Sequence, residues 1–526
     1  MLKESINPTR LKLLVFAILL SIFMSSLDQT IVATALPTIL KDLGGFNLLS
    51  WIYASYILTS TIAILVVGRL SDIYGRKTFY LLGIVVFVLG SALSGLSHNI
   101  TELIIFRALQ GIGGGALTSL AFASVGDLFP PRERGKWQGV ISSSFGVAAV
   151  VGPLIGGYLT TAFSWNWIFY INVPIGIVAF LLIFKEYPNV KLAKDETVDY
   201  IGIVLLTIFT VALISALIFG GSLFAWTSIQ EYSLWAIFVV FLAIFVIYQA
   251  KVKSPILPLE LFHNKSFVLV NIVAFLTSFG FLGGVVYLPI YFQYVRGVSP
   301  TVSGLYLISL VLGLILTSIF GGLLLTKYGK YKFLIFMSVI FASLGFFLLS
   351  HLGVNTSFLK LSIFMFITGV GLGGLLPILS IVAQNYFPVQ EIGVVTGALQ
   401  FFRNIASAVG LAAMGAILNN TLIRNITLNK PTNLPPILSS KYDTIKNSFT
   451  GTSTTFSTSI PGLNKIPKFL VKYVNEITHA VYVSLSQSVG IVMLFSSIVI
   501  IISLVFVIFI KQVPLRTSNT ESVTHG

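Results

Sequence analysis

The chain has 526 residues, of which 56% are hydrophobic and 9% charged, and its mean hydropathy is +0.95. Soluble domains carry roughly 25% charged residues, so this composition excludes a soluble globular protein and indicates a membrane protein. The formal net charge is +15, but many basic residues fall in short gaps between apolar runs, where they set membrane topology. We therefore expect a lipid bilayer, and no nucleic acid, as the partner.

Cysteine and histidine usage argues against metal chemistry. The chain contains no cysteine, which removes disulfides, thiolate chemistry and cysteine-based metal sites. Its five histidines lie in the gaps between apolar runs, near the ends of those runs or in the C-terminal tail. We therefore expect neither a metal site nor a cofactor.

Fourteen apolar runs are each near the roughly 20 residues that a helix needs to cross a bilayer. The first run is longer than the roughly 7–15 apolar residues of a signal peptide, so we expect it to be an uncleaved span. The predicted spans are 11–36, 47–68, 78–97, 101–123, 136–160, 167–185, 199–220, 232–250, 266–290, 301–324, 332–351, 359–383, 392–418 and 482–510.

The basic residues predict that both termini are cytoplasmic in a protein of the cell membrane. An even number of spans puts the termini on one side, and short cytoplasmic loops are enriched in lysine and arginine. The residues that fall on the terminal side are Lys3, Arg10, Lys12, Arg76, Lys77, Arg132, Arg134, Lys136, Lys251, Lys253, Lys265, Lys327, Lys330 and Lys332. Segment 419–480 is basic too, but it is about sixty residues long, where the rule weakens, and we expect it to be an extracellular loop.

The sequence repeats itself at an offset of 254 to 260 residues. "FPPRERGKWQG" at 129–139 matches "FPVQEIGVVTG" at 387–397, and "GRLSDIYG" at 68–75 matches "GGLLLTKYG" at 321–329. Two parallel repeats are a known carrier layout. We predict an all-α polytopic membrane protein with a six-helix bundle over 1–190, two inserted helices over 191–262, a second six-helix bundle over 263–511 and a cytoplasmic tail over 512–526.

The two repeats differ in charge. Four charged residues of the first half stand where the second half has uncharged ones: Asp72 against Thr326, Arg107 against Ile367, Asp127 against Asn385 and Arg134 against Ile392. A purely structural role would need similar residues in both halves. We infer that the first half handles ions and gating, whereas the second mostly shapes a cavity.

Six motifs carry a family resemblance: "LDQTIVATALP" (27–37), "GRLSDIYGRK" (68–77), "RALQGIGGG" (107–115), "GVAAVVGPLIGG" (146–157), "WNWIFYINVPIG" (165–176) and "YLPIYFQYVRGVSPTVSG" (287–304). Together they resemble the fourteen-helix drug/proton antiporter branch of the major facilitator superfamily. The resemblance covers nearly the whole chain. It implies the major facilitator fold, with two six-helix bundles plus two inserted helices, and export of drugs in exchange for protons.

The loop "GRLSDIYGRK" is the predicted gate. A cationic turn that only fixes topology would explain Arg76 but not Asp72. Span 13 begins near Gly393 on the same side, and a helix N-terminus is partly positive, so Asp72 can dock there and hold the two halves closed. The resemblance gives the loop the same role, and the predicted gating residues are Gly68, Asp72, Gly75 and Arg76.

The fifth span carries a pattern of small residues that the resemblance identifies as the antiporter motif. A small-xxx-small pair favours close helix packing, and an internal proline removes one helix hydrogen bond. Plain packing with a kink is therefore the alternative interpretation. The motif residues are Gly146, Gly152, Pro153, Gly156 and Gly157.

Asp28 is the acid that lies deepest inside a predicted span. Counted from the outer ends of their spans, Asp28 and Arg107 reach similar depths, and Gln110 follows Arg107 by one helical turn. Ionisable residues within a membrane are functional candidates by default. We expect Asp28 and Arg107 to couple proton movement to transport, with a static ion pair as the alternative.

The second half offers candidates for a substrate cavity. Gln400, Arg403 and Asn404 share one face of span 13, and span 9 carries Asn271, Phe275 and Tyr287. Arg403 is either structural or a sign that the cavity accepts anionic or zwitterionic ligands. The aromatic residues suit a wall for lipophilic ligands and suit helix packing equally well. The expected cavity residues are Asp28, Gln110, Asn271, Phe275, Tyr287, Gln400, Arg403 and Asn404.

These features together predict a monomeric secondary transporter that exports small amphipathic, cationic compounds in exchange for protons by alternating access. The proton gradient would supply the energy. A carrier of the same fold for uptake, or for a lipid or an endogenous metabolite, is the alternative. A membrane enzyme, channel or receptor is disfavoured, because "GRKT" at 75–78 lacks the spacing of a P-loop and no nucleophile–base set is present.

Overall fold

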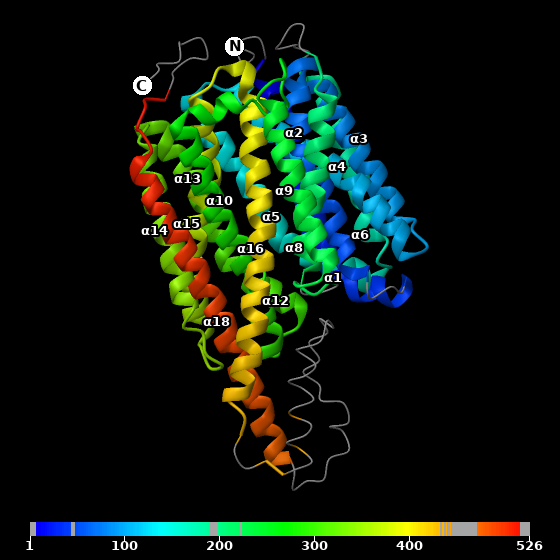
Figure 1. Ribbon diagram of the computed structural model, residues 1–526, viewed down its shortest axis with the longest axis vertical. Helices are drawn as coiled ribbons and strands as arrows, with labels where there is room; N and C mark the ends of the chain where they lie inside the picture. The colour runs from blue at the N-terminus through cyan, green and yellow to red at the C-terminus, as the bar shows by residue number, and fades with distance from the viewer. Residues whose placement is uncertain are drawn as a thin grey trace.

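The computed structural model describes residues 7–43, 48–188, 197–220, 224–431, 434–435, 438, 442 and 471–515. Within these ranges the regular structure is helical, apart from one isolated bridge between Gly220 and Phe224. The described residues include 14 helices that are long and apolar enough to cross a membrane. This confirms the predicted all-α membrane fold (Figure 1).

The helices follow one another along the chain. Three short turns accompany them: 3₁₀ turns at Leu259–His263 and Val389–Glu391 and a π turn at Tyr291–Val295. The α-helices are α1 (Pro8–Leu43), α2 (Leu49–Tyr74), α3 (Arg76–Gly95), α4 (Ile100–Leu128), α5 (Pro131–Ala162), α6 (Trp167–Tyr170), α7 (Asn172–Glu186), α8 (Tyr200–Phe219), α9 (Ile229–Gln249), α10 (Lys265–Val285), α11 (Leu288–Ile290), α12 (Pro300–Tyr306), α13 (Ile308–Tyr328), α14 (Tyr331–Leu349), α15 (Phe358–Asn385), α16 (Ile392–Leu428) and α18 (Val471–Phe509).

Polar side chains begin several of these helices. A helix leaves its first backbone N–H groups without partners, and an Asn, Asp or Ser side chain can accept from one of them. Asn99 accepts from the N–H of Glu102, and Ser357 accepts from that of Lys360. The same cap starts α8 at Asp199, α9 at Ser228 and α10 at Asn264. These capping residues therefore mark the position at which each of these helices begins.

Three predicted spans are interrupted. Span 6 is split at Ile171 into α6 and α7, and span 10 is split at Leu307 into α12 and α13. Predicted span 9 ends early, because α10 stops at Val285 and the chain restarts as α11. Pro289 lies in the first turn of α11, where its missing N–H costs nothing. Hydropathy does not register such breaks, since the chain stays apolar across them.

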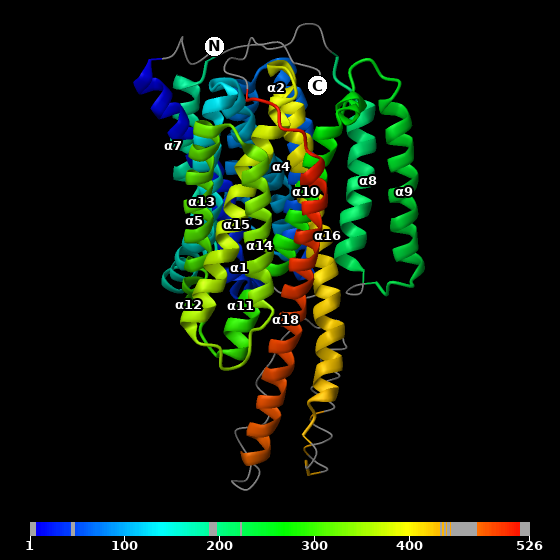
Figure 2. The same ribbon diagram turned by 90° about the vertical axis from the view of Figure 1, so that its left-hand side faces the viewer.

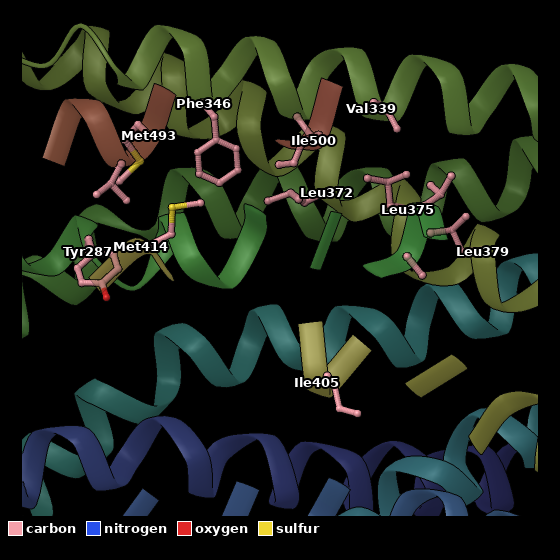
Figure 3. Packing of buried hydrophobic residues seen from close by; sticks show 14 of the residues in the cluster. Tyr287, Val339, Phe346, Leu372, Leu375, Leu379, Ile405, Met414, Met493 and Ile500 are labelled. Carbon is pink, nitrogen blue, oxygen red and sulfur yellow. The ribbon is translucent and has the colours of Figure 1, made fainter. Parts of the chain in front are cut away.

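Two helix pairs make the main contacts between the N-terminal helices α1–α7 and the C-terminal helices α10–α18. These are α2 with α16 and α5 with α13, and smaller contacts join α5 to α15 and α4 to α16. The start of α1 and the end of α18 lie at one end of the bundle, called here the terminal end (Figures 1 and 2). Buried apolar side chains form one cluster among the C-terminal helices, part of which Figure 3 shows, and two smaller clusters among the N-terminal ones.

Helices α8 and α9 stand side by side on the outside of the bundle (Figure 2). The ring centre of Phe219 in α8 lies 4.6 Å from that of Trp51 in α2, with the rings tilted, and the ring centre of Phe209 lies 6.5 Å from that of Phe401 in α16. Asp199 accepts from Gln249 at the end of α9 at 2.6 Å, which ties the pair together at the terminal end. The inserted helices therefore cover the seam between α2 and α16.

The expected extracellular loop 419–480 is partly wrong. Helix α16 continues to Leu428 and α18 already begins at Val471, so that both project beyond the other helices (Figures 1 and 2). The projecting turns hold each other through hydrogen bonds of 3.0 Å from Asn425 to Ser488 and from Asn429 to Ser484. A hydropathy criterion ends a span where such polar residues begin, although the helix itself continues. Residues 443–470 of the predicted loop lie outside the described residues.

Candidate functional site

A buried ion pair joins α1 to α4. Asp28 is fully buried and Arg107 is 1% exposed, and the Arg107 guanidinium donates to the Asp28 carboxylate. The same Arg107 nitrogen donates to Gln110 Oε1 at 2.7 Å, and Gln110 Nε2 donates to the other Asp28 oxygen at 2.8 Å. The three residues that the sequence placed at similar depth therefore form one hydrogen-bonded ring.

Asn172 completes the surroundings of Asp28, and sequence reasoning missed it. Its side-chain N–H groups, at the start of α7, donate to Asp28 at 3.2 Å and to Ser91 of α3 at 3.0 Å. Asn172 is fully buried. A buried asparagine inside the otherwise apolar "INVPIG" was the signal available in the sequence, because a buried amide needs partners. The Asp28 carboxylate of α1 is thus held by side chains of α4 and α7, and Ser91 of α3 in turn holds Asn172.

Glycines of α4 bring this network together. A Cβ on Gly111 would lie 2.5 Å from the carbonyl oxygen of Tyr56, and one on Gly113 would lie 2.6 Å from Phe87 Cα. Side chains at these positions would push α4 away from α2 and α3. The close approach also places the Arg107 guanidinium 4.5 Å from the centre of the Tyr56 ring, a cation–π contact that helps to offset its burial.

The predicted gate forms a second charged cluster, at the terminal end. Asp72 is fully buried and accepts hydrogen bonds from the backbone N–H groups of Gly393 at 3.1 Å and Val394 at 2.9 Å, in the first turn of α16. Gly68 allows this contact, because a Cβ there would lie 2.8 Å from the Gly393 carbonyl oxygen. Gly75 makes the turn between α2 and α3 with a φ of 96°, which favours glycine.

Arg76 belongs to this cluster and is not a solvent-exposed topology signal. It is 2% exposed, lies 2.8 Å from Asp72 and pairs with Asp127 of α4. Asp127 was noted in the sequence only as a charge that the second half lacks. Nearby, burial and the Asp127 carboxylate raise the pKa of Tyr187, so its hydroxyl stays protonated and shares a hydrogen bond of 2.8 Å with Ser124.

Other contacts across the terminal end also join the two halves. Gln138 of α5 donates to Gln384 of α15 at 3.1 Å, and Gln384 donates to Thr396 of α16 at 2.9 Å. Gly135 and Gly322 face each other at the crossing of α5 and α13, where a Cβ on Gly322 would lie 2.6 Å from the Gly135 carbonyl carbon. The halves are therefore in direct contact at this end.

The antiporter motif lies on a helix that packs against both halves. Gly152 faces α1, where a Cβ would lie 2.8 Å from Thr30 Cβ, and Thr30 donates to the Ala148 carbonyl at 2.9 Å. Gly146 faces α13, and Pro153 lies 3.3 Å from the Cβ position of Gly304. The remaining motif residues continue the helix, Gly156 buried and Gly157 half-buried. The geometry is close packing, and it places α5 between α1 and α13.

The second-half candidates form a separate group. Arg403 is 5% exposed and donates to Gln400 Oε1 and to the Leu376 carbonyl, both at 3.4 Å. Asn404 donates to Thr61 of α2 at 3.4 Å, which places it at the seam between the halves. Among the described residues no hydrogen bond links this group to Asp28 or Arg107.

The candidates Asn271 and Phe275 of α10, and Tyr287 just before α11, are mainly engaged in packing. Asn271 is buried and donates to the Phe267 carbonyl of its own helix at 2.9 Å. The Tyr287 hydroxyl donates to the Leu411 carbonyl of α16 at 3.1 Å, and Phe275 packs half-buried against the C-terminal cluster. These contacts fit helix packing better than an exposed aromatic wall. Across the described ranges, no three His, Asp or Glu residues gather in a way that could hold a metal ion.

Comparison with known proteins places these features in a family. The family model described as "Major Facilitator Superfamily" matches residues 18–411. The chain is 36% identical over 512 residues to the multidrug transporter protein MdtP of Bacillus subtilis, covering 97% of this chain and 94% of that one. It is 38% identical over 415 residues to multidrug resistance protein 3 of the same organism, covering 79% and 81%.

Solved structures share the fold. The human organic anion transporter MFSD10 aligns with a TM-score of 0.63 at 15% identity, over 95% of this chain and all of that chain (100%). The proton:xylose symporter XylE aligns with a TM-score of 0.59 at 13% identity, over 98% of both chains. The family match and the curated relatives indicate a transporter that needs no cofactor, and not an enzyme. The chain belongs to the major facilitator superfamily.

Proposed function

We propose that this transporter exports amphipathic, monovalent cationic compounds across the cell membrane in exchange for protons, as a monomer that works by alternating access. Two relatives that carry "multidrug" in their names support the substrate class. The terminal end of the bundle would face the cytoplasm, in agreement with the basic residues of the loops on that side.

The observation that carries the proposal is the buried carboxylate of Asp28, held by Arg107, Gln110 and Asn172. When Asp28 is deprotonated, the pair with Arg107 is neutral, and a cation can approach it. When Asp28 is protonated, Arg107 leaves one net positive charge. At an effective dielectric constant of about 20, two like charges about 4 Å apart repel by about 4 kcal/mol. A proton and a cationic substrate therefore compete for the same site.

The contacts at the terminal end support the second element of the proposal, a gate. Asp72 bridges α2 and the first turn of α16 with charge-assisted hydrogen bonds. With these contacts made, the site would be closed to the cytoplasm. Proton entry from outside would then displace the substrate outward, and breaking the contacts would expose Asp28 to the cytoplasm for proton release and reloading.

The test is transport by Asp28→Asn in proteoliposomes. An asparagine keeps an oxygen that accepts from Arg107 but cannot release a proton. We expect the wild-type protein to accumulate a lipophilic cation when a pH gradient is imposed, and the variant to lose this pH-driven transport. Melting curves should show that the variant is folded.

Asp42→Asn is the matched control, because Asp42 lies on the same helix α1 but is exposed and accepts a hydrogen bond from Trp165 at 3.1 Å. It should transport at the wild-type rate. Undiminished pH-driven transport by Asp28→Asn would refute the proposed role of Asp28. Wild-type transport that does not depend on the pH gradient would refute proton coupling itself.

A further inference from the structure

Arg403 is a buried cation in a part of the chain that supplies no anion for it. It lies in α16 with 5% of its surface exposed. Between Lys265 and Leu428 the only acidic residue is Glu391, which precedes the first residue of α16. Among the described residues no carboxylate forms an ion pair with Arg403. The contrast with Arg107, which has Asp28 as its partner, is complete.

The hydrogen bonds of Arg403 do not compensate for its burial. Two of its N–H groups reach Gln400 and the Leu376 carbonyl at 3.4 Å, which is long for a charged donor. Its Nε–H is buried without an acceptor. A buried charge without a partner is among the costliest features that a protein can carry. The guanidinium thus retains donors for an anion that is not part of this chain.

Arg403 also borders a small pocket between three helices. Its wall is apolar on the α15 side and carries two hydroxyl-bearing residues on the α10 side. The lining residues are Thr277, Ser278, Phe281, Leu372, Leu375, Leu376 and Arg403. Figure 3 shows Leu372 and Leu375 on α15 within the buried cluster of the C-terminal helices. The pocket volume is about 20 Å³, enough for a group the size of a water molecule.

These features fit the acidic end of an amphipathic molecule. A guanidinium offers parallel N–H donors that match the two oxygens of a carboxylate. The apolar wall beside it suits the carbon skeleton that carries the acid. The pocket has room for about one carboxylate oxygen, so the rest of the ligand would lie outside it, toward the seam where Asn404 meets Thr61.

We propose that Arg403 binds a carboxylate of the transported substrate, so that the substrates include zwitterions as well as simple cations. This rests on the proposed function, because it assumes that Asp28 receives the cationic group. Such a substrate places its cation in the N-terminal half and its acid in the C-terminal half. Binding then bridges the two halves that move relative to each other during transport.

The experiment compares two dyes of nearly the same shape. Rhodamine B carries a free carboxylate on a cationic ring system, whereas its ethyl ester is a simple cation. Both are measured in proteoliposomes under an imposed pH gradient, with wild-type protein, Arg403→Gln and Arg403→Lys. We expect Arg403→Gln to raise the KM for rhodamine B about tenfold and to change the KM for the ester less than twofold. The KM of Arg403→Lys for rhodamine B should lie between those of the wild type and Arg403→Gln, because lysine keeps the charge but lacks the parallel N–H donors of the guanidinium.

Arg424→Gln is the matched control, because Arg424 lies on the same helix and is exposed. It removes the same charge and should leave both KM values unchanged. An equal change for the two dyes in Arg403→Gln would overturn the proposal and make Arg403 a structural residue. A wild-type protein that does not couple transport of the ester to protons would instead contradict the proposed function, whatever the ratio of the KM values for the two dyes.

A second measurement covers the case in which Arg403→Gln does not fold. Purified wild-type protein is heated with 1-naphthoate or with 1-naphthalenemethanol, which lacks the carboxylate. We expect the melting temperature to rise with naphthoate alone. Equal shifts with both compounds, or none with either, would count against a carboxylate site at Arg403.

Discussion

The carboxylate of Asp72 in α2 accepts a hydrogen bond of 3.1 Å from the backbone N–H of Gly393 in α16, 321 positions later in the chain. It therefore caps the positive end of a helix that belongs to the other half of the molecule. An anion at a helix N-terminus contributes about 0.3–1 kcal/mol when exposed and up to about 2 kcal/mol when buried. This contact is small enough to be broken in every transport cycle.

We expect Asp72→Ala to open the terminal end more often. Losing about 1 kcal/mol shifts the equilibrium between closed and open states about fivefold. Because the chain has no cysteine, Ser119→Cys supplies a single thiol at a fully buried position beside Gly68. In inside-out vesicles, a membrane-impermeant maleimide should label this thiol about fivefold faster when Asp72 is replaced. Adding Asp42→Asn to the same single-cysteine protein should leave the rate unchanged, and equal rates in all three would show that Asp72 does not hold the gate.

Gly68→Val should act on the same gate through packing. A Cβ at position 68 would lie 2.8 Å from the Gly393 carbonyl oxygen and 3.1 Å from Ser119 Oγ. Backbone cannot move aside as a side chain can, so the closed contact would be lost and the Ser119→Cys thiol would label faster. Gly321→Val is the comparison, because a Cβ there has no neighbour closer than 3.8 Å. Labelling that is equally slow in both variants would contradict a closed contact at Gly68.

The sequence predicts much of this architecture because hydropathy, charge and repetition are local signals. The number of spans follows from apolar runs, and the docking of Asp72 follows from the polarity of a helix N-terminus near Gly393. The contact between Asp28 and Arg107 follows from equal depth in two spans. Each of these inferences needs only distances along the chain.

What the sequence did not reveal depends on packing between helices. Arg76 looks like a loop cation until α3 and α4 bring Asp127 against it. Asn172 looks like one polar residue in an apolar run until α7 packs beside Asp28. The projecting turns of α16 and α18 hold each other through contacts such as that of Asn425 with Ser488. Such partners come from distant segments, and composition alone does not identify them.

Removing both charges of the buried pair should be less harmful than removing one. Arg107→Gln leaves the Asp28 carboxylate buried without its cation, and breaking a buried pair in this way costs about 3–5 kcal/mol. Asp28→Asn combined with Arg107→Gln leaves two neutral amides that can bond to each other. We expect the double variant to recover most of the stability lost in Arg107→Gln, while pH-driven transport stays absent. Melting of the purified proteins, followed by tryptophan fluorescence, measures the first effect; a double variant less stable than Arg107→Gln would contradict the electrostatic account.

The two faces of the antiporter motif should respond differently to an added methyl group. In Gly152→Ala the new Cβ would lie 2.8 Å from Thr30 Cβ and 3.2 Å from the Ile31 backbone nitrogen. In Gly146→Ala the nearest atoms are side-chain carbons of α13 at 3.2–3.3 Å, which can rotate away. Overpacking costs about 1–3 kcal/mol, and at Gly152 it must be relieved by moving α1, two residues from Asp28. We expect Gly152→Ala to lower the melting temperature and the pH-driven transport rate well below those of Gly146→Ala, when both are normalised to the amount of protein in the vesicles. Equal effects at the two positions would mean that the motif acts only through general helix packing, independent of the site on α1.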